Sequence, residues 1–217
     1  MEQLDHLLGE QEGRDVLRSF QKGVTLIELL MGMAIVGMLM FVAIPSFSTF
    51  LQNTQIRNAA ETTMAGLNLA RAEALRRNAN IRFQFVSNLT SSCALSSTAL
   101  NWVVSVSDPA GACNVAPSDT TSPQIVQKRS ASEGTSNITP TITGGTSVTF
   151  SGLGRLSGTG ITQIDFSNAR GGTCEHLDST NGKMRCLRVI ISGGGQAKMC
   201  DPKVTTAGPP YDSRACI

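Results

Sequence analysis

Apolar positions divide the chain into a short polar leader, one uninterrupted apolar run and a long mixed segment. Residues 24–44 contain a single charged residue, Glu28, and Pro45 follows the run. About 20 apolar residues are enough to cross a bilayer as a helix. We therefore predict a transmembrane helix over residues 24–45, because a buried core helix is rarely this long.

The helical pattern continues beyond Pro45 to about residue 79. Proline removes one backbone donor, so we expect a local kink at Pro45 rather than the end of the helix. Apolar residues then recur at three- and four-residue steps, which predicts an amphipathic helix with one face on a globular domain. They are Phe47, Phe50, Leu51, Ile56, Ala60, Met64, Leu67, Ala70 and Ala74.

Beyond Asn80 the pattern changes to the alternation that is typical of strands. The predicted strands cover 81–85, 100–106, 124–128, 146–150, 161–166, 187–191 and 196–199. Residues 130–147 are rich in Ser, Thr and Gly and contain Pro140, so we predict a flexible loop or wide hairpin there. The expected fold class is α+β, with a long N-terminal helix packed on a strand-rich antiparallel domain.

Six cysteines all follow the apolar run, and an even number on one side of a membrane indicates disulfides in an oxidising compartment. Many connectivities are possible, and we predict that sequence neighbours pair. The pairs are Cys93–Cys113, Cys174–Cys186 and Cys200–Cys216. A metal site is the alternative, but no C-x-x-C pair occurs and Cys174-Glu175-His176 lacks the spacing of zinc ligands.

Charged residues predict the orientation of the apolar run in a membrane and mark Glu28 as an acid that needs a partner. Three bases in the leader, Arg14, Arg18 and Lys22, precede the run, which predicts a cytoplasmic N-terminus. An ionised side chain inside hydrocarbon costs roughly 2.5–3.5 kcal/mol, so Glu28 needs a partner. Cutting the chain after Gly23 exposes a new α-amine that could pair with Glu28 of a neighbouring copy. An uncleaved signal anchor is the alternative.

The residues around Gly23 and Glu28 resemble a known signal sequence. A leader that ends in Lys22-Gly23, followed by T-L-I-E-L-L over residues 25–30 and the apolar run, resembles the class III signal of type IV prepilins and type II secretion pseudopilins. Val24 stands where that family usually has Phe. The segments 68–78 and 150–155 resemble the GspH/FimT branch, which includes FimT and FimU.

The resemblance implies a pilin-like fold and a structural role. A prepilin peptidase would remove leader 1–23 and methylate the amine of Val24, using S-adenosylmethionine. The inner membrane would hold helix 24–45 as a single pass, with domain 46–217 in the periplasm. The mature chain would then prime or cap a type IV pilus or a type II secretion pseudopilus. Its partners would be lipid, other major and minor pilins or pseudopilins, and an inner-membrane assembly platform.

A DNA-binding minor pilin for DNA uptake is the alternative function. Some FimT-like pilins bind DNA through a late Gly-Arg-x-Arg motif, whose place here is taken by residues 195–198, Gly-Gln-Ala-Lys. Gly154-Arg155 matches half the pattern. Fewer positive contacts weaken phosphate binding, so Arg155 and Lys198 could make weak DNA contacts at most.

No catalytic motif, nucleotide fingerprint or metal-binding spacing stands out in the sequence. The two histidines are His6, in the leader, and His176, in a cysteine-bounded loop. We therefore expect neither an enzyme nor a bound cofactor.

Overall fold

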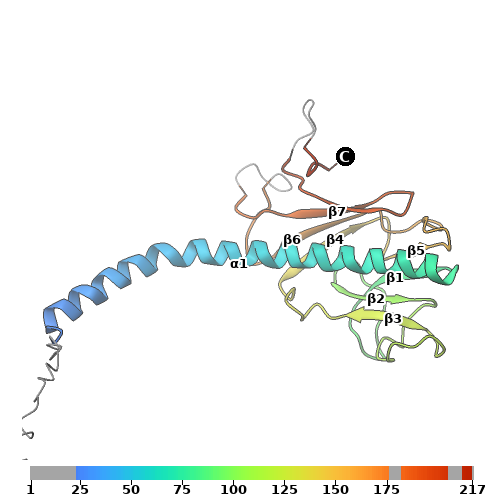
Figure 1. Ribbon diagram of the computed structural model, residues 1–217, viewed down its shortest axis with the longest axis horizontal. Helices are drawn as coiled ribbons and strands as arrows, with labels where there is room; N and C mark the ends of the chain where they lie inside the picture. The colour runs from blue at the N-terminus through green and yellow to red at the C-terminus, as the bar shows by residue number, and fades with distance from the viewer. Residues whose placement is uncertain (1–22, 176–181, 205–211, 217) are drawn as a thin grey trace, which may run out of the picture. The chain divides into compact units, whose positions relative to one another are not determined.

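The computed structural model describes residues 23–175, 182–204 and 212–216, and for residues 42–46 it describes the backbone alone. Most of the predicted leader, both histidines and the end of the C-terminal tail therefore lie outside the described residues. The chain forms two units, Met1–Ala43 and Ile44–Ile217. The second unit contains all the strands (Figure 1).

One long helix, α1 (Leu26–Arg77), supplies all the described α-helix. It ends two residues before the predicted boundary, at Asn78, whose φ of 49° lies in the left-handed region that asparagine tolerates better than most residues. The N–H of Ala79 donates to the carbonyl of Ala74 at 3.2 Å, and the N–H of Asn78 to that of Leu75 at 3.3 Å. This pair of bonds is a Schellman motif, which satisfies carbonyls that the helix end would leave open.

Eight strands form two antiparallel sheets of four strands each, in the orders β3-β2-β1-β5 and β4-β6-β7-β8 (Figure 1). The strands are β1 (Ile81–Val86), β2 (Asn101–Ser105), β3 (Ile125–Arg129), β4 (Ile138–Thr143), β5 (Ser147–Phe150), β6 (Gln163–Asn168), β7 (Leu187–Ile191) and β8 (Ala197–Cys200). The predicted α+β architecture is confirmed.

Both sheets pack on the same helix within the second unit. Near the start of this unit, Asn168 of β6 donates its side-chain amide to Gln55 of α1 at 3.1 Å. Further along, Gly66 of α1 lies against the rings of Phe83 and Trp102 from the other sheet. The face of α1 that meets the sheets carries many small side chains, which lets the backbones approach closely. Its fully or almost fully buried members are Ile56, Ala59, Ala60, Thr63, Leu67, Ala70 and Ala74.

Strand β4 corrects the prediction of a flexible loop or wide hairpin over residues 130–147, because it pairs with β6. Its side chains alternate in burial, with Ile138 and Pro140 buried and Thr139 and Thr141 exposed. It pairs with β6 along its whole length. The Ser/Thr composition and Pro140 hid this alternation, yet proline is acceptable on an edge strand because one side of that strand has no ladder bond to lose. β4 is such an edge.

Three disulfides hold the loops of the second unit, and the structure pairs the cysteines as sequence neighbours: Cys93–Cys113, Cys174–Cys186 and Cys200–Cys216. The first belongs to a small second core on the β1-β2-β3 sheet, together with Val86, Val103 and Ile125. Nearby, the Lys128 ammonium donates to the carbonyls of residues 113, 114 and 115 at 2.8–3.0 Å. Every donor of this cation therefore has an acceptor, which fixes the loop that follows Cys113.

Gly66→Ala tests the close packing of α1 on β1. A Cβ atom here would lie 2.8 Å from Phe83 Cε2 and 3.1 Å from the Trp102 ring. The gain in helix propensity is about 1 kcal/mol, whereas overpacking a core costs about 1–3 kcal/mol. We expect a net loss of about 1 kcal/mol, measured by denaturant unfolding of the full chain in detergent.

Asn58→Ala is the matched control, because Asn58 is exposed on the same helix. This substitution should leave stability unchanged or raise it slightly through helix propensity. A more stable Gly66→Ala protein would contradict the packing described here.

Candidate assembly segment

The start of α1 is built by Thr25 and Glu28. Thr25 precedes the first helical residue, and its hydroxyl accepts a hydrogen bond from the Glu28 N–H at 3.3 Å. The Thr25 carbonyl accepts the first helical bond, from Leu29, at 3.1 Å. Thr25 is therefore the N-cap, and T-x-x-E is the sequence of a capping box. The sequence analysis missed this role of Thr25, although the three-residue spacing to Glu28 signals it.

Glu28 lies in the first turn of α1, where the helix dipole favours negative charge. Glu28 is exposed. It takes part in none of the ion pairs found among the described residues. Val24 lies four residues earlier and is 71% exposed. Gly23 has open space around its Cα, with no atom within 4 Å of a Cβ built there. Gly23 and Val24, the two residues on either side of the expected cut, are therefore both exposed with respect to the described residues.

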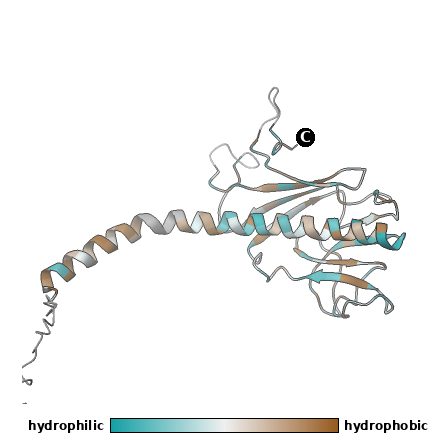
Figure 2. Cartoon of the chain, in the orientation of Figure 1, coloured by the Kyte–Doolittle hydropathy of each residue, from teal (hydrophilic) through white to brown (hydrophobic). Residues whose placement is uncertain are grey.

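Apolar side chains are exposed along residues 24–41. Figure 2 shows that the ribbon of this first part of α1 is coloured mostly hydrophobic. The large ones, each more than half exposed, are Val24, Leu26, Ile27, Leu29, Leu30, Met31, Met33, Ile35, Val36, Met38, Leu39, Met40 and Phe41. Gly32 and Gly37 add two positions with nothing within 4 Å of a Cβ. Contiguous apolar surface of this extent marks a site that another apolar phase or protein covers.

Within the described residues, no helix is both long and apolar enough to cross a membrane. The transmembrane helix predicted over residues 24–45 stays a prediction.

The helical assignment continues through Pro45. The side chains of residues 42–46 lie outside the described set, and the kink expected at Pro45 stays a prediction.

The two candidate DNA-contact residues lie on neighbouring segments. Gly195, in the β7–β8 turn, has a φ of 77° and packs so closely on the Gly154 carbonyl that a Cβ atom would clash with that oxygen. Arg155 follows Gly154 and is exposed. Lys198 is exposed on β8, but its ammonium donates to the Ala215 carbonyl at 3.2 Å. Weak DNA contact by Arg155 and Lys198 stays a prediction.

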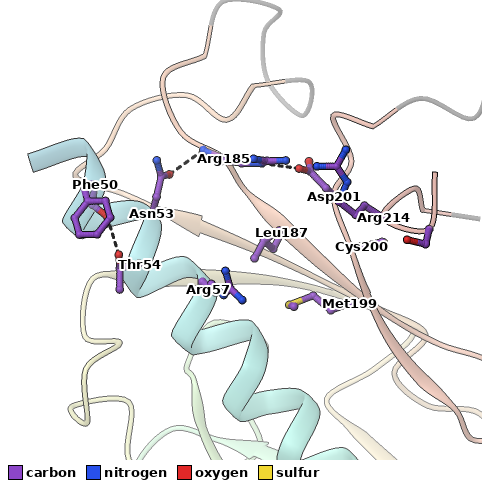
Figure 3. Close-up of a pocket in the computed structure, with 11 residues that line it drawn as sticks. Phe50, Asn53, Thr54, Arg57, Arg185, Leu187, Met199, Cys200, Asp201 and Arg214 are labelled. Carbon is purple, nitrogen blue, oxygen red and sulfur yellow. Dashed lines mark hydrogen bonds and ion pairs between the residues drawn. The ribbon is translucent and has the colours of Figure 1, made fainter. Parts of the chain in front are cut away.

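A groove of about 570 Å³ lies between α1 and the sheet that ends at β8 (Figure 3). The N–H of Arg185 donates to the Asn53 side chain at 2.9 Å, which ties the segment before β7 to the helix. The Arg185 guanidinium pairs with Asp201 at 2.7 Å, and the Asp201 side chain is only 5% exposed. Sequence analysis could not find this groove, because its walls come from residues that lie far apart in the chain.

Residues 59–195 match the family model of the type II transport protein GspH. The chain belongs to the GspH family. Residues 18–44, which contain Gly23, Val24 and Glu28, match the prokaryotic N-terminal methylation motif. As a member of this family the chain is a structural pilin-type protein and not an enzyme.

Two crystal structures of the type IV minor pilin FimU from Pseudomonas aeruginosa (strain PAO1) are similar to this GspH-family chain. The identities are 16% and 17%, and the TM-scores are 0.40 and 0.42. The similarity covers 66% and 69% of this chain and 90% and 91% of the FimU chains. No curated protein matches the chain. In the described part of this GspH-family protein, no group of three or more His, Cys, Asp or Glu residues could hold a metal ion.

In this member of the GspH family, acidic side chains neutralise part of the positive charge at the arginine-rich end of α1. Glu73 pairs with Arg76 at 2.8 Å and with Arg77 at 2.7 Å, and Arg77 also pairs with Asp119. Two hydrogen bonds, the stronger effect from Arg76 and the weaker from Arg77, lower the pKa of Glu73 below its ordinary value of 4.5. Arg71 donates to the Gly154 carbonyl at 2.9 Å. These cations hold the end of the helix to its surroundings rather than forming an uncompensated patch for nucleic acid.

Glu73→Gln tests this network through its pH dependence. A lowered pKa in the folded state means that Glu73 stabilises the fold above pH 4.5 and loses this effect as pH falls through the lowered pKa. At pH 7 we expect the variant to be less stable by up to about 1 kcal/mol. At pH 3 the difference should be smaller, as measured by thermal unfolding of both proteins.

Glu61→Gln is the control, because Arg57, the ion-pair partner of Glu61 among the described residues, is 69% exposed. Its effect should be small at either pH. An undiminished difference between Glu73→Gln and the parent protein at pH 3 would contradict the ion-pair account.

Proposed function

We propose that this GspH-family protein is a minor pilin or pseudopilin, a structural subunit that primes or caps a type IV pilus or a type II secretion pseudopilus. The observation that carries the proposal is the exposed apolar segment that begins at Val24 and has one acid, Glu28, in the first turn of its helix. Such a surface needs a cover, and a filament made of packed helices supplies one.

Processing comes first in this proposal. A prepilin peptidase cuts after Gly23 and methylates the new amine of Val24. The helix 24–45 stays in the inner membrane, with the domain 46–217 in the periplasm. Lipid covers the apolar side chains until an assembly platform moves the subunit into the filament, where other pilins replace the lipid.

Charge pairing then sets the register of assembly. The amine of Val24 and the carboxylate of Glu28 carry opposite charges about one helical turn apart along the chain. A pair between two subunits neutralises both charges, whereas a subunit one step out of register leaves an unpaired charge in an apolar environment. The low dielectric around the helices strengthens this pair and raises the cost of leaving it unmade.

Gly23→Ala tests the processing step. The small residue before the cut has open space around it, and an added methyl group should hinder its entry into the peptidase. We expect most of the chain to keep its leader, measured by the size of the membrane-bound product on an immunoblot. Gly32→Ala, a glycine with equally open surroundings inside the helix, should be processed normally. Normal processing of Gly23→Ala would contradict the proposed cut.

Glu28→Ala tests the charge pair. The variant should be cut and held in the membrane as the parent is, but its amount in sheared filaments should fall about tenfold or more, because an unpaired buried amine costs at least 1.4 kcal/mol. Quantitative immunoblots of membrane and filament fractions give the ratio.

Two control variants make the Glu28 experiment specific. Glu28→Asp keeps the charge and should retain part of the incorporation. Glu61→Ala removes an acid that is 44% exposed in the second unit and should incorporate normally. Undiminished incorporation of Glu28→Ala would remove the pairing mechanism while leaving the processing step intact.

A further inference from the structure

The second unit begins at Ile44, and its first turns of helix α1 carry exposed apolar side chains. They are Phe47, Phe50 and Leu51, which are 62%, 64% and 46% exposed. At 1.5 Å per residue, the two phenylalanines lie roughly 3–8 Å along the helix from Pro45, the end of the predicted membrane span. The headgroup region of a bilayer is roughly 5–8 Å thick on each side. In a chain that spans the membrane up to Pro45, both rings therefore lie at the depth of the headgroups.

Two further segments of the second unit lie beside the next turns of α1. One follows β6, where the Asn168 side-chain amide donates to Gln55 at 3.1 Å. The other precedes β7, where the N–H of Arg185 donates to the Asn53 side chain at 2.9 Å (Figure 3). Both helix residues lie within ten residues of Pro45, roughly 12–15 Å along the helix. These segments are therefore held at the end of the unit where the chain enters it.

The two segments are also joined to each other. The Cys174–Cys186 disulfide links them. The N–H of Glu175 donates to the Met184 carbonyl at 2.9 Å, and the N–H of Met184 donates to the Thr173 carbonyl at 3.3 Å. The segments therefore form one connected rim beside α1.

This rim, residues 168–175 and 182–186, presents two exposed cations, Arg170 and Lys183. The residues between its two segments lie outside the described set. With those residues counted, the sequence 168–186 contains three bases and two acids, a net charge of +1. The rim is therefore weakly basic, with its cations on the surface.

The described acids next to the rim are neutralised within the unit. Lys203 pairs with Glu175 at 2.6 Å, and the Glu175 side chain is 27% exposed. Arg185 pairs with Asp201 at 2.7 Å, and the Asp201 side chain is 5% exposed. The exposed charge that this part of the surface offers to a partner is therefore positive.

The exposed apolar side chains and the rim together surround α1. With 3.6 residues per turn, Phe47, Phe50 and Leu51 occupy one arc of the helix, and the rim covers the arc that includes Asn53 and Gln55. A partner on one side of the helix would meet only part of this set. A bilayer surface, through which a helix passes, meets all of it.

We propose that Arg170 and Lys183, together with Phe47 and Phe50, dock the second unit on anionic phospholipid headgroups before assembly. The rings enter the headgroup region, while the long basic side chains reach down to the phosphates. The rim lies within about 10 Å of the phosphates, the distance over which charges attract at 0.1 M salt. This inference rests on the proposed function, because that function places the preceding helix in the membrane.

Lysine labelling of the full chain in lipid nanodiscs tests the docking. A water-soluble amine-reactive reagent modifies exposed lysines, and mass spectrometry of peptides gives the rate at each one. We expect labelling of Lys183 to be at least about threefold slower in phosphatidylglycerol-rich nanodiscs than in phosphatidylcholine nanodiscs. Salt at about 1 M should remove the difference, because it shortens the screening distance to about 3 Å. Lys198, which is exposed on β8 outside the rim, is the internal reference and should react equally in both lipids.

Arg170→Glu tests the contribution of the rim to this protection. The substitution reverses the charge of an exposed side chain, so the fold and the three disulfides should be unchanged. The rate at Lys183 should become nearly equal in the two lipids, because the neighbouring cation no longer attracts the phosphates. Arg155→Glu, an exposed arginine outside the rim, makes the same change in net charge and should keep the difference.

Three results would overturn the inference and leave the proposed function standing. One is an equal rate at Lys183 in the two lipids for the parent chain. Another is equal slowing of Lys183 by inorganic phosphate in phosphatidylcholine nanodiscs, because the rim would then bind a small free anion. The third is slowing of Lys198 to the same extent as Lys183, which indicates a general attraction of the chain to anionic lipid. A chain that does not insert into nanodiscs of either lipid would instead refute the proposed function itself.

Discussion

A single carboxylate at the start of an apolar helix is the constraint on which the proposed function of this protein depends. Glu28 fits its own helix, because the first turn favours negative charge and Thr25 caps the Glu28 N–H. It does not fit an apolar environment, where an ionised group without a partner costs several kcal/mol. In the proposed filament, a second molecule meets both conditions by bringing a positive charge close to Glu28.

In the second unit, the two sheets pack on α1, and small side chains on the helix allow them to approach closely. Ala59, Ala60, Ala70 and Ala74 bury small side chains, and Gly66 allows the Phe83 ring to approach closely. The two sheets can therefore share one helix. Disulfides and the Lys128 ammonium hold the connecting loops.

Local patterns in the sequence were sufficient for most of the elements. The three- and four-residue spacing predicted the helix, and the left-handed conformation of Asn78 explains why it ends at Arg77. The disulfides join sequence neighbours, so a local argument found the same pairs. Strand β4 was missed because threonines and Pro140 have the composition of a loop, and only its pairing with β6 makes it a strand.

Contacts between segments far apart in the chain could not be predicted from the sequence. The contact between Gly154 and Gly195, and the groove between Phe50, Arg185 and Asp201, arise from segments that meet only in the folded chain. Single residues in these segments look like ordinary surface positions. The direction of each N–H in β8 likewise depends on register, which cannot be read from four residues alone.

The measurement that tests the account most directly is the intact mass of the protein isolated from cells with its disulfides preserved. The account predicts a chain that begins at Val24, carries one methyl group on its amine and has lost six hydrogens to three disulfides. A mass that corresponds to the uncut chain would contradict it, because no α-amine would then exist to pair with Glu28.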